Sequence, residues 1–288
     1  RRESAIAPMV KRSAATASGD LVLERTTART TEFGSTTNVD PVKLEIFNNL
    51  FMNIAEQMGV VLENTAVSVN IKERLDFSCA VFDPHGELVA NAPHMPVHLG
   101  SMSESIKSTI ARNPHRKPGD AIVMNAPYQG GTHLPDITVV SPVFDDDGKE
   151  ILFWSASRGH HADVGGSAPG SMTPRATTVD EEGVLFDNFK IVDEGRFCEA
   201  ELVDLLTDHK YPARNPHQNV ADLSAQIAAN EKGIQELRKM VAHFGLDVVQ
   251  AYMGHVQDNA EESVRRVISA LTDSEYEYPT DQGSVIKV

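Results

Sequence analysis

The chain has 288 residues, 41% of them hydrophobic, which is enough to bury the core of one large domain or two ordinary ones. Its 26 basic and 41 acidic side chains give a net charge of −15, which disfavours nucleic acid and anionic membrane surfaces as partners. Its two cysteines lie too far apart to suggest a disulfide framework or a cysteine zinc site, and no apolar run of about 18 residues or signal-peptide segment occurs, so we expect a cytoplasmic protein.

The first part of the chain, residues 1–38, is rich in Ser, Thr, Ala and Arg and predicts a tail and linker. Its only strand-like run is Leu21–Glu24, after a turn signal at residues 18–20. Asp40 followed by Pro41 is typical of an N-cap and first helical position, and opens a long amphipathic helix. The apolar positions of this helix recur every three or four residues: Leu44, Phe47, Phe51, Ile54, Met58 and Val61.

Two β-hairpins are predicted where apolar runs flank turn residues. They comprise residues 77–82 with 87–90 around the turn 83–86, and residues 137–144 with 151–157 around the turn 145–148. Between the hairpins we expect a loop holding His94 and His98, a helix at 101–112 and a short buried strand at 121–125.

The second half of the chain begins with a loop at 159–178, rich in Gly, Pro, Ser and Thr and too long for a simple connector, so we expect it to carry function. A helix is predicted at 198–208. Two more, at 220–244 and 247–271, would form an antiparallel helical hairpin around Gly245. The last four residues, 285–288, resemble a strand whose sheet continues in sequence beyond this chain, so we expect a fragment. The predicted fold class is α+β, a mixed or antiparallel sheet of hairpins packed on long amphipathic helices.

The mouth of the second hairpin carries the chemistry. His133 and Asp136 precede the hairpin, and His160 and His161 leave it. A turn centred near residue 147 sets Asp136 opposite Arg158 and places His133 beside the two adjacent histidines. Directly opposed side chains lie about 5 Å apart, close enough to share one cation. Taken singly, each histidine is more simply a loop residue at a strand end, but the combined set favours a metal site.

Two histidines and one carboxylate are typical of a catalytic Zn, Mn or Fe ion, which keeps open positions for water or substrate. Such an ion polarises a carbonyl and lowers the pKa of bound water to about 7. His98 and Asp76 are weaker site candidates, since a loop role for His98 and a solvated face for Asp76 explain them equally simply. Neither a GxxxxGK[ST] loop nor a GxGxxG after a strand occurs, so we expect no nucleotide site on this chain.

Several sequence blocks resemble the hydantoinase B family. They are residues 70–79 (NIKERLDFSC), residues 91–102 (NAPHMPVHLGSM), the two histidine blocks, and residues 169–172 (PGSM). The resemblance runs from about Asp40 to the end, in a family that includes 5-oxoprolinases, N-methylhydantoinases and acetone carboxylase large subunits, and the blocks look most like 5-oxoprolinase. In the acetone carboxylase relatives a His, an Asp three residues later and a single His ahead of Asp-x-Gly hold a Mn-type ion. That pattern maps onto His133, Asp136 and His160.

The resemblance implies a metal-dependent part of an ATP-dependent 5-oxoprolinase, which opens 5-oxo-L-proline to L-glutamate after a hydantoinase A-type unit has phosphorylated the amide. ATP and Mg would then belong to that partner unit, fused or separate. Residues 17–25 look similar to the last strand of such a unit, so 1–38 would be its end. Residues 39–288 would be the N-terminal half of the B-type catalytic domain.

His161 and Asp163 are the expected proton-moving groups, with His98 and Asp76 as further catalytic candidates. We expect the parent protein to be a homo-oligomer. Alternative functions are a hydantoinase or other lactamase, an acetone-carboxylase-like subunit, or a non-catalytic assembly subunit whose helices at 220–271 form an interface.

Overall fold

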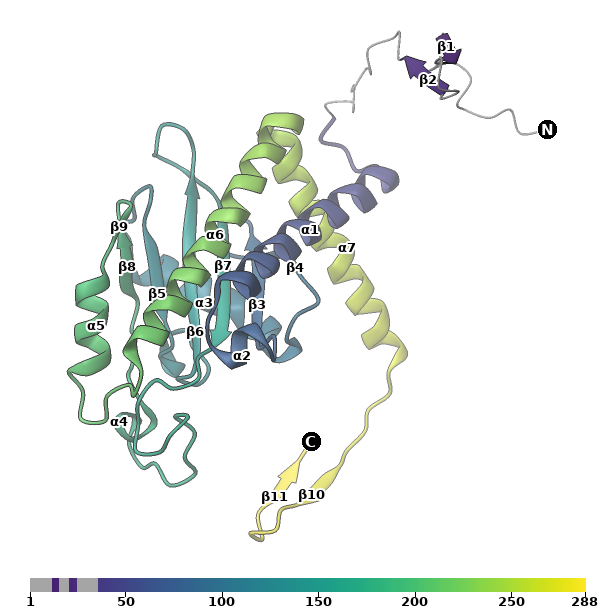
Figure 1. Cartoon of the computed structure of the whole chain (residues 1–288). Helices are drawn as coiled ribbons and strands as arrows, with labels where there is room; N and C mark the ends of the chain where they lie inside the picture. The colour runs from purple at the N-terminus through teal and green to yellow at the C-terminus, as the bar shows by residue number, and fades with distance from the viewer. Residues whose placement is uncertain (1–11, 16–20, 25–35) are drawn as a thin grey trace. The chain divides into compact units, whose positions relative to one another are not determined.

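The computed structural model describes residues 12–15, 21–24 and 36–288, and the chain divides into compact units at 1–36 and 37–288 (Figure 1). In the first unit, β1 (Arg12–Ala15) pairs antiparallel with β2 (Leu21–Glu24). The predicted strand at 21–24 is therefore confirmed, whereas its partner was not predicted. The predicted turn at 18–20 lies outside the described residues.

A seven-stranded antiparallel sheet, in the order β4-β3-β7-β6-β5-β8-β9, forms the centre of the second unit. Its strands are β3 (Phe77–Phe82), β4 (Leu88–Asn91), β5 (Ala121–Met124), β6 (Asp136–Phe144), β7 (Ile151–His160), β8 (Phe189–Asp193) and β9 (Arg196–Phe197). Both predicted hairpins and the buried strand are confirmed, and so is the α+β class. The short strands β8 and β9, at one end of the sheet, were missed because they carry little apolar alternation.

Helices cover both faces of this sheet. The long helices α1 (Pro41–Thr65) and α6 (Pro216–Phe244) cross one face, as Figure 1 shows, and α3 (Pro96–Arg112) packs on the other. The remaining helices are α2 (Val69–Lys72), the 3-10 turn η1 (Pro127–Gln129), α4 (Val179–Glu182), α5 (Glu199–Thr207) and α7 (Leu246–Ala270). Two-sided cover explains why every residue of β6 is buried.

Alternation along the strands sorts side chains between the two faces. In β3, Cys79 and Val81 join the core under α1 and α6, whereas Ala80 and Phe82 join the core under α3. Trp154 and Ala156 of β7 also lie on the α3 face. Residues further along β7 with the same parity therefore point toward α3.

Three predicted helix starts can be compared with the helix starts in the structure. The start of α1 is confirmed, because Asp40 Oδ1 accepts hydrogen bonds from the N–H groups of Val42 and Lys43. Two other predicted starts were wrong: α3 begins at Pro96 instead of 101, and α6 begins at Pro216 instead of 220. In both, proline occupies the first helical turn, where its missing N–H costs no hydrogen bond. As a result, His98 lies in the first turn of α3 and not in a loop.

The last two long helices, α6 and α7, meet at Gly245 (φ 85°), as predicted for the helical pair. After α7, β10 (Glu277–Pro279) pairs with β11 (Val285–Lys287), so the expected terminal strand finds its partner within the chain. An apolar stripe on the last turns of α7 is more than half exposed: Val264, Val267, Ile268 and Leu271. Within the described residues, no helix has both the length and the apolar character that crossing a bilayer requires.

Candidate metal centre

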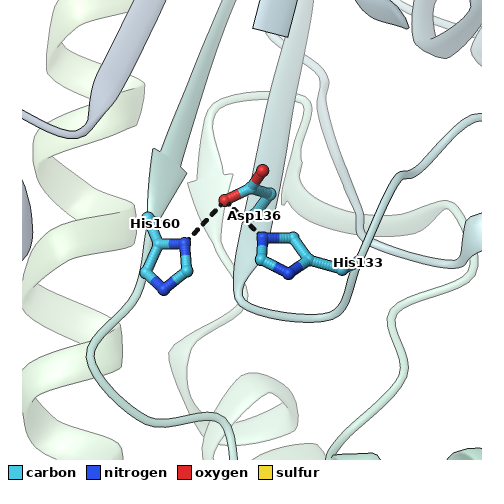
Figure 2. A group of neighbouring side chains, drawn as sticks. All are labelled: His133, Asp136 and His160. Carbon is cyan, nitrogen blue, oxygen red and sulfur yellow. Dashed lines mark hydrogen bonds and ion pairs between the residues drawn. The ribbon is translucent and has the colours of Figure 1, made fainter. Parts of the chain in front are cut away.

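The ends of β6 and β7 bring two histidines onto one carboxylate. Asp136, the first residue of β6, pairs with His160, the last residue of β7, and His133 lies in the turn before β6. His133 Nε2 and His160 Nδ1 each lie 2.9 Å from Asp136 Oδ1 (Figure 2). Across the described part of the chain, these three side chains form a group whose ligand atoms lie within 4.8 Å of one another.

The predicted register of this hairpin was wrong by two residues. Asp136 lies opposite His160, and Arg158 lies opposite Thr138. One residue of the error arises because the turn is centred between residues 147 and 148, with Asp145 N–H donating to the Glu150 carbonyl. The other arises because the pairing shifts between Val143 and Phe144, which a turn-centred count cannot anticipate. A displacement of two residues keeps every side chain on its predicted face, so the predicted proximity of the histidines and Asp136 survives the error.

The charge state of Asp136 follows from its hydrogen bonds. Burial acts to raise the pKa of Asp136, but hydrogen bonds from His133, His160 and His98 outweigh it and hold that pKa well below its usual range. The same contact with Asp136 raises the pKa of His133. The carboxylate is therefore ionised at neutral pH, with two ring nitrogens aimed at one of its oxygens.

His98 and Asp76 lie against the other side of this group. His98 is buried, with Nε2 3.4 Å from Asp136 Oδ2 and 3.9 Å from Asp76 Oδ1. Its Nδ1 lies 2.9 Å from the hydroxyl of Ser78. Asp76 Oδ2 lies 3.9 Å from His160 Nδ1, and the residue before Asp76, Leu75, has a left-handed backbone (φ 55°). The structure thus brings both weaker candidates to the cluster.

A buried guanidinium adjoins the cluster on the α3 face. Arg158 is fully buried and donates hydrogen bonds to the hydroxyls of Thr138, Ser101 and Ser105. Burial lowers its pKa to about 10, and the charge of Asp136 acts in the opposite direction. Arg158 therefore ties α3, which carries His98, to the hairpin that carries Asp136. The sequence analysis placed Arg158 at this hairpin but gave it no role.

His161 and Asp163 are engaged elsewhere. His161 is fully buried, with Nε2 3.0 Å from Gln226 Oε1 and Nδ1 3.2 Å from Asn219 Nδ2, both on α6. Asp163 accepts hydrogen bonds from its own loop and from Arg214. Of the adjacent histidines, His160 is the one whose ring contacts Asp136, as the resemblance implied.

The polar residues on the core-facing side of α6 were missed at the sequence level. Asn219, Asp222, Gln226 and Asn230 are all buried, at spacings of three and four. That spacing is the available signal: polar side chains on the face of a helix that otherwise packs on a core must find buried partners. Gln226 and Asn230 donate to carbonyls of β6 and β7, and Asn219 to His161 and Asp163 just beyond β7. Asp222 accepts from the N–H groups that precede α2.

A cavity of about 390 Å³ lies beside His133. Its walls are His133, Leu134, Pro135, Ser171, Met172, Thr173, Pro174 and Glu182. Half of these come from the long loop that the sequence analysis expected to carry function. A larger cavity of about 600 Å³ shares Glu182 but contains none of the cluster residues. Of these two cavities, the smaller one, which is in the size range of small-molecule sites, is the one that adjoins the cluster.

Comparisons with known proteins show which family the chain belongs to. Residues 40–288 match the Hydantoinase B/oxoprolinase family model. The chain is 50% identical to 5-oxoprolinase 1 of Arabidopsis thaliana over 243 residues, which is 81% of this chain and 19% of that protein. It is 45% identical to 5-oxoprolinase of Saccharomyces cerevisiae over 264 residues, which is 87% of this chain and 20% of that protein. It thus spans about a fifth of the length of these relatives.

Solved structures show the same fold. The ATP-dependent caprolactamase from Pseudomonas jessenii aligns with a TM-score of 0.74 and 27% identity, covering 85% of this chain and 42% of that one. The nucleotide-free acetone carboxylase structure also gives a TM-score of 0.74, at 18% identity, over 83% of this chain and 31% of that one, which is a likeness of fold alone. By the extent of the family match and the geometry of its core, the chain belongs to the hydantoinase B/oxoprolinase family.

Proposed function

We propose that this chain supplies the metal-dependent part of an ATP-dependent cyclic-amide hydrolase of the 5-oxoprolinase type. The observation that carries the proposal is the convergence of His133 Nε2 and His160 Nδ1 on one oxygen of Asp136, beside a cavity of small-molecule size. The 5-oxoprolinases among the relatives support the substrate class.

The residues present fit a divalent transition ion such as Mn, Zn or Fe. Two imidazole nitrogens and a carboxylate form a donor set that leaves positions open for water or substrate. The ligand atoms already lie within 4.8 Å of one another, so His133, Asp136 and His160 would hold the ion with little rearrangement. When bound, such an ion supplies Lewis acidity for a carbonyl or activates water at neutral pH.

The side chains around the cluster would orient its carboxylate. His98 lies 3.4 Å from Asp136 Oδ2, the oxygen that the two ligand nitrogens do not contact. An outer partner of this kind fixes a metal-binding carboxylate in one orientation. Asp76, beside both His98 and His160, is the nearest further acid–base candidate. We assign proton transfer to His98 and Asp76 in preference to His161 and Asp163. The hydrogen bonds of His161 hold it in the core, and those of Asp163 hold it against its own loop.

The reaction divides between two units. A lactam carbonyl resists water because its amide is resonance-stabilised. Transfer of the ATP γ-phosphoryl group to the amide oxygen makes the carbonyl carbon more electrophilic and releases ADP. One water adds to that carbon, the ring C–N bond breaks as a proton moves to the nitrogen, and a second water hydrolyses the resulting acyl phosphate to the carboxylate and phosphate. With no nucleotide-binding motif in this sequence, the phosphoryl transfer and its ATP and Mg are assigned to an A-type unit. Three further points stay predictions. Residues 1–38 would be the end of that unit, and residues 39–288 the N-terminal half of the B-type domain. The parent protein would be a homo-oligomer, and its location would be the cytoplasm.

The other functions differ in measurable ways. A hydantoinase or an acetone-carboxylase-like subunit would keep the ion but change the substrate, whereas an assembly subunit would fold without any ion. Elemental analysis of the intact parent protein, beside its turnover of 5-oxoproline with ATP, separates these cases. A metal-free, folded and fully active parent would exclude a metal-dependent role.

Replacing His133 tests the assignment directly. In the intact enzyme, His133→Ala removes one of the two nitrogen ligands, so we expect ATP-coupled opening of 5-oxoproline to fall by at least about 100-fold. The matched control is His85→Ala, at an exposed histidine in the turn between β3 and β4, which should keep wild-type activity. Wild-type coupled activity in His133→Ala would refute the metal assignment.

A further inference from the structure

A buried polar network lies behind the metal centre, on the α6 face of the sheet. Its core is His161, which is fully buried although it directly follows a residue of the cluster. The ring lies between Asn219 and Gln226 of α6, at 3.2 Å and 3.0 Å. A neutral histidine held on both nitrogens by amides is a fixed structural element and not a group free to reach substrate.

The hydrogen bonds of the Asn219 and Gln226 side-chain amides fix the tautomer of the His161 ring. Gln226 Nε2 donates to the carbonyls of Ile137 (2.9 Å) and Ser157 (3.2 Å), so Gln226 Oε1 is the acceptor facing the ring, and His161 Nε2 carries the hydrogen. Asn219 Nδ2 donates to the carbonyl of Asp163 at 2.9 Å, so it also donates to His161 Nδ1. Burial lowers the pKa of His161, consistent with a neutral ring.

The same network holds the backbone on either side of Asp136 and directly after His160. His161 N–H donates to the carbonyl of Pro135 at 2.8 Å, one residue before Asp136. Gln226 binds the carbonyl of Ile137, one residue after Asp136. Movement of His161 would therefore displace the ends of β6 and β7 together.

We propose that His161 is a positioning residue: clamped by Asn219 and Gln226, it fixes the two strand ends so that His160 and Asp136 stay in ligand geometry. This inference rests on the proposed metal function. It assigns the paired histidines different roles, the first as a ligand and the second as an anchor. Misplacing a ligand by a fraction of an ångström weakens an ion site, and loss of a supporting partner typically costs 10–100-fold in metal affinity.

The test measures Mn²⁺ affinity by calorimetry and the paramagnetic resonance spectrum of bound Mn²⁺, on the 288-residue chain. The variants are His161→Ala and Gln226→Ala. The matched control is Asn230→Ala, because Asn230 lies one helical turn further along α6 and likewise donates to a β6 carbonyl, that of Val139 at 3.0 Å, but farther from the cluster. Thermal unfolding without metal is measured for every variant.

We expect His161→Ala and Gln226→Ala to weaken Mn²⁺ binding at least tenfold and to alter the spectrum. Asn230→Ala should lower the melting temperature to a similar degree and leave affinity within threefold of wild type. Equal affinity in all variants, or an equal loss in Asn230→Ala, overturns the positioning role while leaving the metal function intact. A wild-type chain that binds no Mn²⁺ overturns both. If His161→Ala fails to fold, Gln226→Ala decides.

Discussion

Asp163 shows how a carboxylate close in sequence to the candidate ligand His160 can serve the fold alone. Its two oxygens accept hydrogen bonds from the N–H groups of Gly165, Gly170 and Arg214 and from the Arg214 guanidinium, at 2.7–3.2 Å. Burial acts to raise the pKa of Asp163, but these bonds outweigh it and lower the pKa below its usual value. A group with a lowered folded-state pKa stabilises the fold above its unfolded pKa, about 3.9, and that contribution disappears as pH falls through the folded value.

We therefore expect Asp163→Asn to lower the free energy of unfolding at pH 7 by about 1.5–3 kcal/mol, the usual range for hydrogen bonds to a charged group. The difference from wild type should begin to shrink as the pH drops below about 4, where the carboxylate of the unfolded chain protonates, and should disappear only at the lower pH where the folded-state carboxylate protonates. Urea unfolding at pH 7, 5 and 3.5 measures it, with Asp146→Asn in the exposed turn between β6 and β7 as control. An undiminished difference at pH 3.5 would show that the lost charge is not the cause.

At the scale of elements, α6 packs tightly against α1 and β7 at Gly233. A Cβ built there would lie 2.6 Å from Met58 Sδ of α1 and 2.6 Å from Ser155 Oγ of β7. Gly254 of α7 has open space around the same position. Alanine is better than glycine in a helix by about 1 kcal/mol, so the two sites differ in packing and not in propensity.

We expect Gly254→Ala to raise the free energy of unfolding by about 0.5–1 kcal/mol and Gly233→Ala to lower it by about 1–3 kcal/mol, since overpacking outweighs the gain in propensity. Chemical unfolding of both variants beside wild type is the measurement. A stabilised Gly233→Ala would mean that α1 and α6 separate without cost.

Element types were predictable where a local rule decides them. Asp40-Pro41 fixed the start of α1, and the Asp/Gly-rich turn residues 145–148 fixed the second hairpin. The starts of α3 and α6 were predicted too late because Pro96 and Pro216 were assigned to loops. Proline also occupies the first turn of helices, as it does in both of these. The predicted hairpin register was wrong because the turn centre lies between residues 147 and 148 and because the pairing shifts beside Phe144, which no local signal marks. Together these move the pairing by two residues, so each side chain keeps its predicted face and His133, Asp136 and His160 still meet; their role as ligands stays a prediction.

At the scale of the whole molecule, the parts of the site that escaped prediction are those set by contacts between distant segments. His98 reaches Asp136 because α3 covers the face of the sheet toward which Asp136 points. His161 lies apart from the cluster because its ring packs against α6 on the opposite face. Periodicity gives each helix an apolar face, but it does not say which sheet face that helix will cover. The candidate ligands lie at one hairpin and hence could be grouped by sequence reasoning. Their supporting contacts could not, because they come from separate helices, with His98 on α3 and Gln226 on α6.

The cluster spans the two central strands of the seven-stranded sheet, so an ion held there should stabilise the whole second unit. A ligand that binds only the folded state adds RT ln(1 + [L]/Kd), about 2.7 kcal/mol at 100 times Kd. For a unit of this size each kcal/mol raises the melting temperature by about 2–4 °C, so saturating Mn²⁺ should raise it by about 5–10 °C. Scanning calorimetry with and without a chelator measures the shift, which should vanish in His133→Ala and persist in His85→Ala. An equal shift in all three proteins would place the stabilising ion elsewhere, because only the first variant removes a ligand from the point where His133, Asp136 and His160 converge.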